Sequence, residues 1–464
     1  MSLHSVDVDQ FDEDGRPVSP DGERHRGQLR MAYRLARSHR DRLLFVRGIG
    51  WMVYDGKRWS EDERGAAKRA VLSVLRDALA DSLHDPTLRA DVTKCETDAG
   101  VLGVLGLASA LEEFAATIDD LDADPHLLNC ANGTLDLRTG QLREHDARDR
   151  LTKVTRAAYD ETAAGSTWST FLASVLPDES EREYLRRVIG QALYGRVREH
   201  LLPILIGTGA NGKSTAMNAL GYALGDYVAV IDPALLMAHD RGRGSANPEL
   251  MELLGVRLVI GSETEEGRKL DEAVMKRLTG GDPITARPLY QKPVTWAPSH
   301  QLIYVTNHLP SVKGNDPATW RRVRVIPFDV TVPPEARDLR LGERLELAAD
   351  EVLLWAVAGY LDYLDHGMAE PSSVMRATDA YKAESDDVAR FITDACTVGA
   401  QVAATTRELY AAWQRWAVSD GAEPLTEKAL GKELDRLGYE ARRTKKGMTR
   451  DSIAPLETGG GEGW

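Results

Sequence analysis

Residues 201–215 read Leu-Leu-Pro-Ile-Leu-Ile-Gly-Thr-Gly-Ala-Asn-Gly-Lys-Ser-Thr. The first six are apolar and predict a buried strand, and a helical pattern follows over residues 216–224. The glycine-rich stretch between them has the spacing Gly-x-x-x-x-Gly-Lys-Ser, in which backbone N–H groups and a helix N-terminus bind phosphate oxygens. A chance glycine-rich turn is the alternative, but it would not explain the complete spacing between a strand and a helix. The stretch therefore predicts a nucleoside triphosphate site.

Each residue of this loop has an expected role in binding ATP. Lys213 is expected to reach the β- and γ-phosphates, and the Ser214 hydroxyl is expected to hold Mg²⁺. The expected nucleotide-binding residues are Gly207, Thr208, Gly209, Ala210, Asn211, Gly212, Lys213, Ser214 and Thr215.

Composition narrows the class of protein. The 464 residues suggest about two to four domains, and 42% apolar with 28% charged residues is typical of a soluble globular protein. No run approaches the ~20 apolar residues that cross a bilayer, and the polar, acidic N-terminus does not resemble a secretory signal. We therefore expect a cytoplasmic protein with no membrane partner. The three cysteines include no Cys-x-x-Cys pair and predict neither a disulfide framework nor a zinc site.

A net charge of -14 argues against nonspecific coating of nucleic acid by the whole surface, although it leaves room for a locally basic channel. Two stretches are basic, residues 24–42 and residues 436–450. Each of these stretches either binds a polyanion or forms a solvated face.

Carboxylates follow a second apolar strand. Residues 257–267 read Arg-Leu-Val-Ile-Gly-Ser-Glu-Thr-Glu-Glu-Gly. ATP hydrolysis needs one carboxylate near Mg²⁺ and another that orients or deprotonates water. Glu263 and Glu265 alternate along an extended chain, so both can face the nucleotide, and Glu266 can substitute for either. We expect Glu263 to bind the metal as well; a solvated acidic loop is the alternative.

Asn307 ends a further apolar strand at 302–306. Its amide can hydrogen-bond the γ-phosphate or the attacking water, unless it only begins the turn Asn-His-Leu-Pro. Arg321 and Arg322 precede the next strand. Such an arginine, supplied by a neighbouring subunit, stabilises charge on the transferred phosphoryl group. Pairing with Asp316 and Asp329 is the alternative interpretation.

Two hairpins are candidate DNA contacts. In the first, at about 284–296, Arg287, Tyr290 and Lys292 suit a phosphate backbone in a central pore, although an isolated surface hairpin would look similar. The second belongs to a predicted winged helix, in which Thr426 caps a helix over residues 427–437. Its expected DNA-binding residues are Arg442, Arg443, Lys445 and Lys446. A structural or protein-docking role for this module is the alternative.

The chain resembles the superfamily 3 helicases, a branch of the AAA+ ATPases. More narrowly, it is similar to the helicase portion of the phage and plasmid primase family related to the poxvirus primase-helicase. Five stretches carry the resemblance: residues 207–215, 262–267, 276–282, 305–307 and 320–322. The segment 132–140 is similar to the region that precedes the motor in that family.

The resemblance implies a homo-hexameric ring that moves along single-stranded or forked DNA, typically 3′ to 5′, powered by ATP and Mg²⁺ in a bacterial host cell. Lys213, Glu263, Glu265, Asn307, Arg321 and Arg322 are the implied catalytic residues. The family's primase-polymerase domain needs paired aspartates on a strand, whereas residues 135–138 read Leu-Asp-Leu-Arg. We therefore expect no primer synthesis by this chain, although a separate primase can partner it.

The expected fold class is α/β: an AAA+-like P-loop parallel sheet core, an α+β N-terminal region and a C-terminal helical and winged-helix module. Candidate core strands are 203–207, 256–261, 302–306 and 323–327. The expected divisions are a disordered N-terminus (1–23), an N-terminal α+β domain (24–160), a helical collar (161–199), a superfamily 3 helicase AAA+ core (200–332), a helical subdomain (333–400), a winged-helix-like DNA-binding module (401–456) and a disordered tail (457–464).

Three functions compete at this stage. The first is an ATP-dependent replicative DNA helicase of a phage or mobile element. The second is a nucleotide-switched initiator or loader, or a defence-system ATPase, that forms a ring without unwinding. The third, a small-molecule P-loop kinase, is disfavoured because arginines follow a sensor-like Asn307 and no lid segment is evident.

Overall fold

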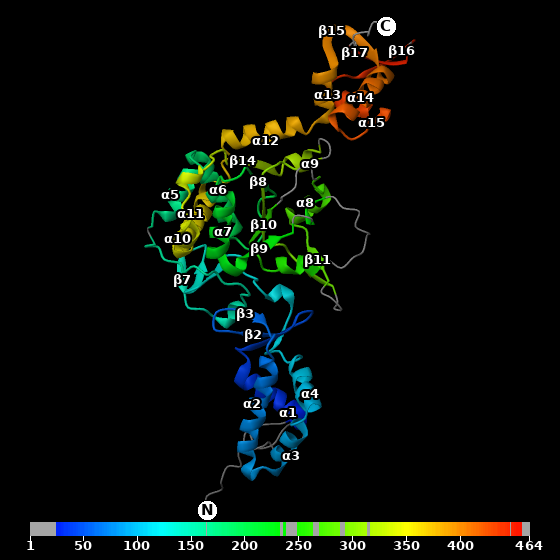
Figure 1. Cartoon of the computed structure of the whole chain (residues 1–464). Helices are drawn as coiled ribbons and strands as arrows, with labels where there is room; N and C mark the ends of the chain where they lie inside the picture. The colour runs from blue at the N-terminus through cyan, green and yellow to red at the C-terminus, as the bar shows by residue number, and fades with distance from the viewer. Residues whose placement is uncertain are drawn as a thin grey trace, which may run out of the picture.

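The computed structural model describes residues 25–163, 165–232, 235–237, 248–262, 269–287, 293–312, 316–445 and 447–456. It has an N-terminal group of helices at one end, a central body around a parallel sheet, and a small module at the other end (Figure 1). Some sequence predictions lie outside the described residues: the two termini, Glu263, Glu265, Glu266, Tyr290, Lys292 and Lys446.

A five-stranded sheet lies at the centre, in the order β14-β8-β13-β10-β9, and every neighbouring pair is parallel. Its strands are β8 (Leu202–Ile206), β9 (Val228–Ile231), β10 (Leu258–Ser262), β13 (Gln301–Thr306) and β14 (Val323–Pro327). The four predicted strands are confirmed, and β9 is an additional edge strand.

Both faces of this sheet are covered, because alternate residues of a strand point to opposite sides. Leu205 and Ile303 join a cluster with one set of helices, whereas Ile204 and Leu302 join a second cluster. The first set is α5 (Thr167–Val175), α6 (Glu179–Ala192), α7 (Lys213–Leu224), α10 (Leu341–Leu347) and α11 (Ala349–His366). The second cluster includes η7 (Pro248–Leu253), α8 (Glu272–Leu278), the antiparallel hairpin β11 (Ile284–Ala286) and β12 (Val294–Trp296), α9 (Pro317–Trp320) and α12 (Ser372–Glu384).

The N-terminal part combines four helices with a sheet of order β3-β2-β1-β4. Its elements are α1 (Gly27–His39), β1 (Leu43–Val46), β2 (Gly50–Tyr54), β3 (Trp59–Glu61), α2 (Ala66–Asp81), η2 (Ser82–His84), α3 (Pro86–Cys95), α4 (Asp98–Ala108), β4 (Ala115–Ala116) and η3 (Ile118–Asp120). Apolar positions at helical spacing form its own core, which includes Leu35, Val71, Val92 and Val104.

A small meander joins this part to the central body. It consists of β5 (Leu127–Cys130), β6 (Gly133–Asp136) and β7 (Gln141–Arg143), followed by η4 (Ala147–Asp149). Arg257, at the start of β10, is buried, donates hydrogen bonds to the Leu127 and Leu193 carbonyls and lies over the Tyr227 ring. It therefore ties the meander to the parallel sheet.

The C-terminal module has the helices and hairpin that were predicted, together with a third strand. Its helices are α13 (Asp387–Ala395), α14 (Thr406–Asp420) and α15 (Glu427–Arg436), and its antiparallel sheet has the order β15-β17-β16. The strands are β15 (Cys396–Thr405), β16 (Ala441–Thr444) and β17 (Gly447–Pro455). The predicted cap is confirmed, since the Thr426 hydroxyl accepts a hydrogen bond from the Ala429 N–H group.

None of the helices in the described ranges combines the length and the apolar character that a bilayer crossing requires.

Candidate nucleotide site at the carboxyl edge of the sheet

The glycine-rich loop follows β8 in the middle of the parallel sheet. β8 lies between β14 and β13, while the chain leaves it for β9 at the far edge. In open parallel sheets, ligands bind at the carboxyl ends of the strands where the connections diverge in this way. The fold therefore places residues 207–212 where a ligand is expected.

Glycines are required in this loop for two reasons. Gly209 and Gly212 have φ angles of +101° and +81°, which side chains rarely adopt. Gly212 also packs so closely that an added Cβ would lie 2.6 Å from Val175 Cγ1. At Gly207 an added Cβ would overlap the Asn211 side chain. The positions expected to approach phosphate are thus the ones that exclude a side chain.

Asn211 holds the loop in shape. Its side chain is buried, and its Nδ2 donates a hydrogen bond of 3.2 Å to the Phe328 carbonyl beyond β14. The Ala210 carbonyl accepts a second bond, of 2.8 Å, from the Val332 N–H group. Asn211 was predicted as one of the nucleotide-binding residues of the loop, and its side chain faces the protein and supports the loop.

Lys213 and Asn307 meet, although they are 94 residues apart in the chain. Lys213 is 3% exposed, and its Nζ donates to the Gly207 carbonyl at 2.7 Å, to Asn211 Oδ1 at 3.0 Å and to Asn307 Oδ1 at 3.3 Å. Burial lowers the pKa of the Lys213 amine. Among the described residues its hydrogen-bond acceptors are all neutral, which leaves the charge of the ammonium group for an anion.

The helix that follows offers further groups to an anion. α7 begins at Lys213, and no side chain caps its N-terminus. Ser214 is exposed in its first turn, and Thr215 lines the neighbouring cleft. Free N–H groups and the positive end of the helix dipole favour phosphate here.

A cleft of about 800 Å³ opens beside the loop. Its walls come from the loop, α5, α7, α10 and the segment between β14 and α10; Thr170, Asn218, Val332 and Leu345 are among them. Its volume lies in the range of small-molecule sites, roughly 300–1,000 Å³. No local pattern predicts these residues, because they line the cleft only through the packing of helices distant in the chain.

The predicted carboxylates come directly after β10. Ser262, the last residue of this strand, pairs in register with Val305, two residues before Asn307. Glu263 and Glu265 themselves lie outside the described residues. Within the described ranges there is no group of three or more His, Cys, Asp or Glu side chains that could hold a metal ion. Ser214 is the described candidate ligand for Mg²⁺.

The two predicted arginines lie at the opposite edge of the sheet. They precede β14, whose first residue, Val323, pairs with Leu202 at the start of β8. The five residues of β8 separate them from the glycine-rich loop by about 17 Å. Arg321 and Arg322 therefore cannot reach a phosphate bound to the same chain.

The two arginines differ in exposure. Arg322 is 7% exposed and its Nη1 donates a hydrogen bond of 2.6 Å to the Ala318 carbonyl, whereas Arg321 is exposed and lines a cleft of about 510 Å³. Asp316, one of the two acids considered as their partners, pairs with Lys276 at 2.5 Å. Of the two arginines, Arg321 is the exposed one, and within the described ranges it forms no ion pair.

The predicted DNA contacts are distributed over two exposed hairpins. Arg287 is exposed at the end of β11. In the C-terminal hairpin, Arg443 and Lys445 are exposed, whereas Arg442 pairs with Asp451 at 2.6 Å. Arg450 is buried and pairs with Asp435 at 2.6 Å, so it holds β17 to α15.

Three family models match the chain. A "D5 N terminal like" domain matches residues 32–177, a family of unknown function (DUF5906) matches residues 205–322, and a "Poxvirus D5 protein-like" domain matches residues 383–456. Together they cover most of the N-terminal part, the strands β9, β10 and β13 of the parallel sheet, and the C-terminal module.

Named relatives come from large DNA viruses of eukaryotes. A "Putative helicase" of Acanthamoeba polyphaga mimivirus is 32% identical over 298 residues, which are 59% of this chain and 31% of the relative. A "Putative primase" of African swine fever virus is 26% identical over 239 residues, or 50% of this chain and 25% of the relative. The matches thus span a third or less of these relatives, and they lend no support to the expected bacterial host.

Among solved structures, the apo A form of the NrS-1 C-terminal region aligns with 89% of this chain and 96% of its own, at 9% identity and a TM-score of 0.48.

Proposed function

Because this chain matches the primase-helicase family related to the poxvirus D5 protein, we propose that it is an ATP-dependent DNA helicase. In this proposal it forms a homo-hexameric ring, encircles single-stranded DNA and serves replication of a virus or other mobile element. A separate primase can partner it.

One observation carries the proposal: the contact between Lys213, directly after the glycine-rich loop, and Asn307, directly after β13. The two residues were selected independently, as a phosphate-binding cation and as a γ-phosphate sensor. The Lys213 amine is held by Asn307 and by the loop. A γ-phosphate would compete for both side chains, so its presence or loss is transmitted to the end of β13.

Each residue of the nucleotide site has a proposed role in ATP hydrolysis. Lys213 and the N-terminus of α7 bind the phosphates, Ser214 binds Mg²⁺, and the adjoining cleft takes the adenosine. Mg²⁺ neutralises charge on the phosphates when bound. Glu263 and Glu265 are proposed to bind this metal and to orient the attacking water.

The arginine that completes the site comes from the next subunit. Arg321 is the better candidate because it is exposed at the amino ends of the parallel strands, here called the amino edge of the sheet. It lies about 17 Å from the glycine-rich loop of its own chain. A head-to-tail assembly brings that edge of one copy to the carboxyl edge of the next, and repeated head-to-tail contacts close into a ring.

Primer synthesis is not part of the proposal. Asp136, the aspartate of the Leu-Asp-Leu-Arg segment, pairs with Arg138 at 2.8 Å, and Arg138 also pairs with Asp124 at 2.9 Å. A carboxylate engaged in this way is poorly available to a polymerase metal.

A strand-displacement assay on forked DNA tests the proposal. We expect the wild type to release a labelled strand when ATP and Mg²⁺ are present, and Lys213→Ala to release none. Hydrolysis that DNA stimulates without displacement would instead favour the second candidate, a nucleotide-switched initiator, loader or defence ATPase, because the exposed Arg443 and Lys445 suit DNA binding in either case.

A further inference from the structure

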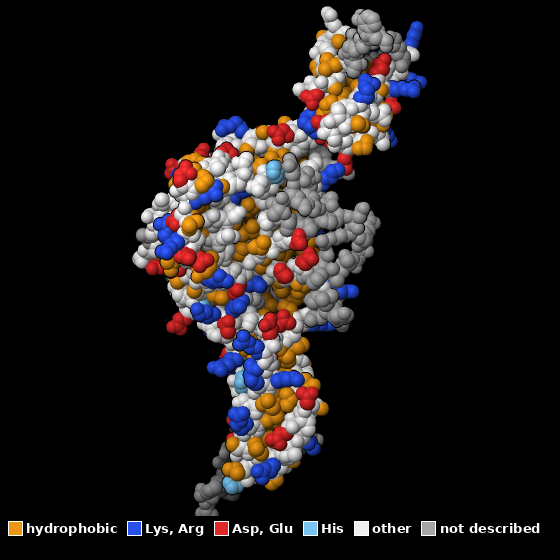
Figure 2. Space-filling view, in the orientation of Figure 1, with side chains coloured by type: hydrophobic (Ala, Val, Ile, Leu, Met, Phe, Trp, Pro, Cys, Tyr) orange, Lys and Arg blue, Asp and Glu red, His pale blue; other side chains and the backbone are white. Residues whose placement is uncertain are grey.

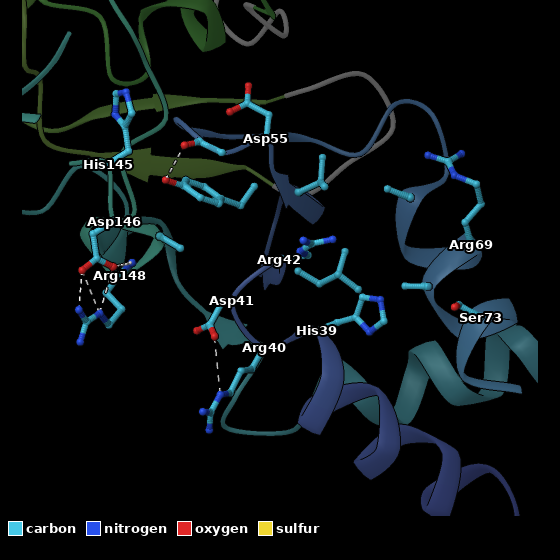
Figure 3. Close-up of a pocket in the computed structure, with 17 residues that line it drawn as sticks. His39, Arg40, Asp41, Arg42, Asp55, Arg69, Ser73, His145, Asp146 and Arg148 are labelled. Carbon is cyan, nitrogen blue, oxygen red and sulfur yellow. Dashed lines mark hydrogen bonds and ion pairs between the residues drawn. The ribbon is translucent and has the colours of Figure 1, made fainter. Parts of the chain in front are cut away.

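A large groove lies where the N-terminal helices meet the central body. Its volume is about 1130 Å³, and its walls come from four separate segments: residues 39–43, 53–56, 66–73 and 145–148. In Figure 3, Arg69 and Ser73 approach from α2, His145 to Arg148 from the opposite side, and His39 to Arg42 lie between them. Basic side chains also gather on the surface at this junction (Figure 2).

The basic stretch at residues 24–42 separates into two parts. Arg30 is buried and pairs with Asp85 at 3.1 Å, and Arg34 pairs with a carboxylate of α2 at 2.7 Å. These ion pairs hold α1 against its neighbours. Arg40 and Arg42 come after the helix and line the groove, so they are not needed for packing.

The carboxylates in the groove have cationic partners other than Arg42 and Arg69. Asp146 pairs with Arg148 at 2.6 Å, and Asp55 lies 3.8 Å from the Arg58 guanidinium and also accepts hydrogen bonds from the backbone N–H groups of Lys57 and Arg58. Asp41 is 3.8 Å from the Arg40 guanidinium. Within the described part of the chain, none of these acids therefore neutralises the remaining arginines of the groove.

Arg42 and Arg69 carry that remaining charge. Both are exposed, and among the described residues neither forms an ion pair. Arg69 donates a hydrogen bond to the carbonyl of Arg64, which leaves its charge uncompensated. They approach the groove from different walls, β1 and α2, so a bound anion can be contacted on two sides.

Aromatic rings accompany these charges. Tyr54 and His39 line the same groove. Burial, and then the charge of Arg42, lowers the pKa of His39. Sites for single-stranded nucleic acid combine guanidinium groups for phosphates with rings on which bases stack.

We infer that this groove binds a short segment of single-stranded DNA, with Arg42 and Arg69 on its phosphates and Tyr54 and His39 against its bases. A strand is inferred rather than a free nucleotide because the two arginines stand on separate walls of the groove and can contact successive phosphates. The inference rests on the proposed function only in the choice of DNA as the ligand. In Figure 1 the N-terminal helices and the C-terminal hairpin lie on opposite sides of the central body, so the groove would add a contact separate from that hairpin.

The experiment measures binding of a fluorescein-labelled oligothymidylate to the full-length protein by anisotropy, over a series of salt concentrations. The variant is Arg42→Ala with Arg69→Ala, and the matched control is Arg89→Ala, an exposed arginine of α3 outside the groove. We expect the double variant to bind about tenfold more weakly, with a salt slope reduced by about 0.7 for each arginine. The control should bind like wild type, and all three should share one melting temperature.

Two results would overturn the inference. One is unchanged affinity and salt slope in the double variant. The other is full competition by thymidine monophosphate at the concentration of oligonucleotide nucleotides, which would identify a nucleotide pocket instead. Hydrolysis and strand displacement, with Lys213→Ala as their control, test the motor separately. If the wild type hydrolyses no ATP and displaces no strand, the helicase proposal fails. The effect of the double variant on binding still decides whether the groove binds DNA.

Discussion

The two edges of the central sheet divide the proposed reaction between them. At the carboxyl edge a backbone loop, Lys213 and Asn307 form a site for phosphate. At the amino edge Arg321 is exposed. Because about 17 Å separates the edges, Arg321 lies too far from the loop of its own chain to contact a phosphate bound there. In the proposed function the unit of activity is therefore a contact between two copies.

The substitution Arg321→Ala is the strongest test of the proposed division of the reaction between the two edges of the sheet. We expect hydrolysis of ATP to fall by about a thousandfold or more, which is typical of losing an arginine supplied in trans. Binding of an ATP analogue should be nearly unchanged, because Arg321 lies at the edge away from its own loop. Steady-state hydrolysis and fluorescent-analogue titration measure the two effects. A variant that hydrolyses at the wild-type rate would show that the amino edge takes no part.

A mixing experiment sharpens the same comparison. Arg321→Ala and Lys213→Ala proteins should each be inactive, since each lacks one edge. When they are mixed in equal amounts and allowed to reassemble, about a quarter of the interfaces combine an intact loop with an intact arginine. We expect hydrolysis to recover to about that fraction of wild type. Failure to recover, when sedimentation shows that mixed assemblies have formed, would mean that each chain supplies both groups itself.

The substitution Arg322→Ala tests whether the buried arginine is structural and the exposed Arg321 catalytic. Replacing it with alanine removes the hydrogen bond to the Ala318 carbonyl and should cost about 1–3 kcal/mol of folding free energy. Chemical denaturation measures that cost. The variant should retain most of its hydrolysis under conditions where it is folded. If Arg322→Ala abolishes turnover and Arg321→Ala does not, the assignment of the arginine in trans is reversed.

The carboxyl edge was largely predictable from the sequence, because its features are local. The loop spacing fixes Lys213 and Ser214, and each apolar run marks a strand. Asn307 could be linked to Lys213 because parallel strands end at one edge. What the pattern did not predict is that Asn211 turns toward Phe328, since that contact depends on a strand more than a hundred residues away.

Other features needed the tertiary structure. β9 is a short edge strand with the exposed residue Val230, so its pattern is weak. β15 pairs with β17, and a strand of this kind is recognisable only through its partner. The different exposure of Arg321 and Arg322 follows from the packing of α9, and neighbouring identical residues give no sequence signal for it.

The amino edge is also expected to be sensitive to acid, through His300. This residue precedes β13, is 3% exposed, and its Nε2 lies 3.1 Å from the Leu278 carbonyl at the end of α8. Burial lowers the pKa of the His300 imidazole to about 4. In the unfolded chain its pKa is about 6.5, so between these values the unfolded state binds more protons than the folded state. Folding free energy is therefore lost as the pH falls through this window and is fully present above it.

Substitution of His300 by glutamine should remove this dependence, since an amide keeps a donor but does not titrate. We expect wild type to lose about 2 kcal/mol more than His300→Gln between pH 7 and pH 5, as two-state linkage requires. Urea unfolding at each pH measures the difference, and the Arg89→Ala protein serves as a control for the general effect of acid. Parallel losses in wild type and His300→Gln would mean that the imidazole is protonated within the folded protein. The interface between α8 and β13 would then be accessible to water, and the amino edge would be less rigid than the burial of His300 indicates.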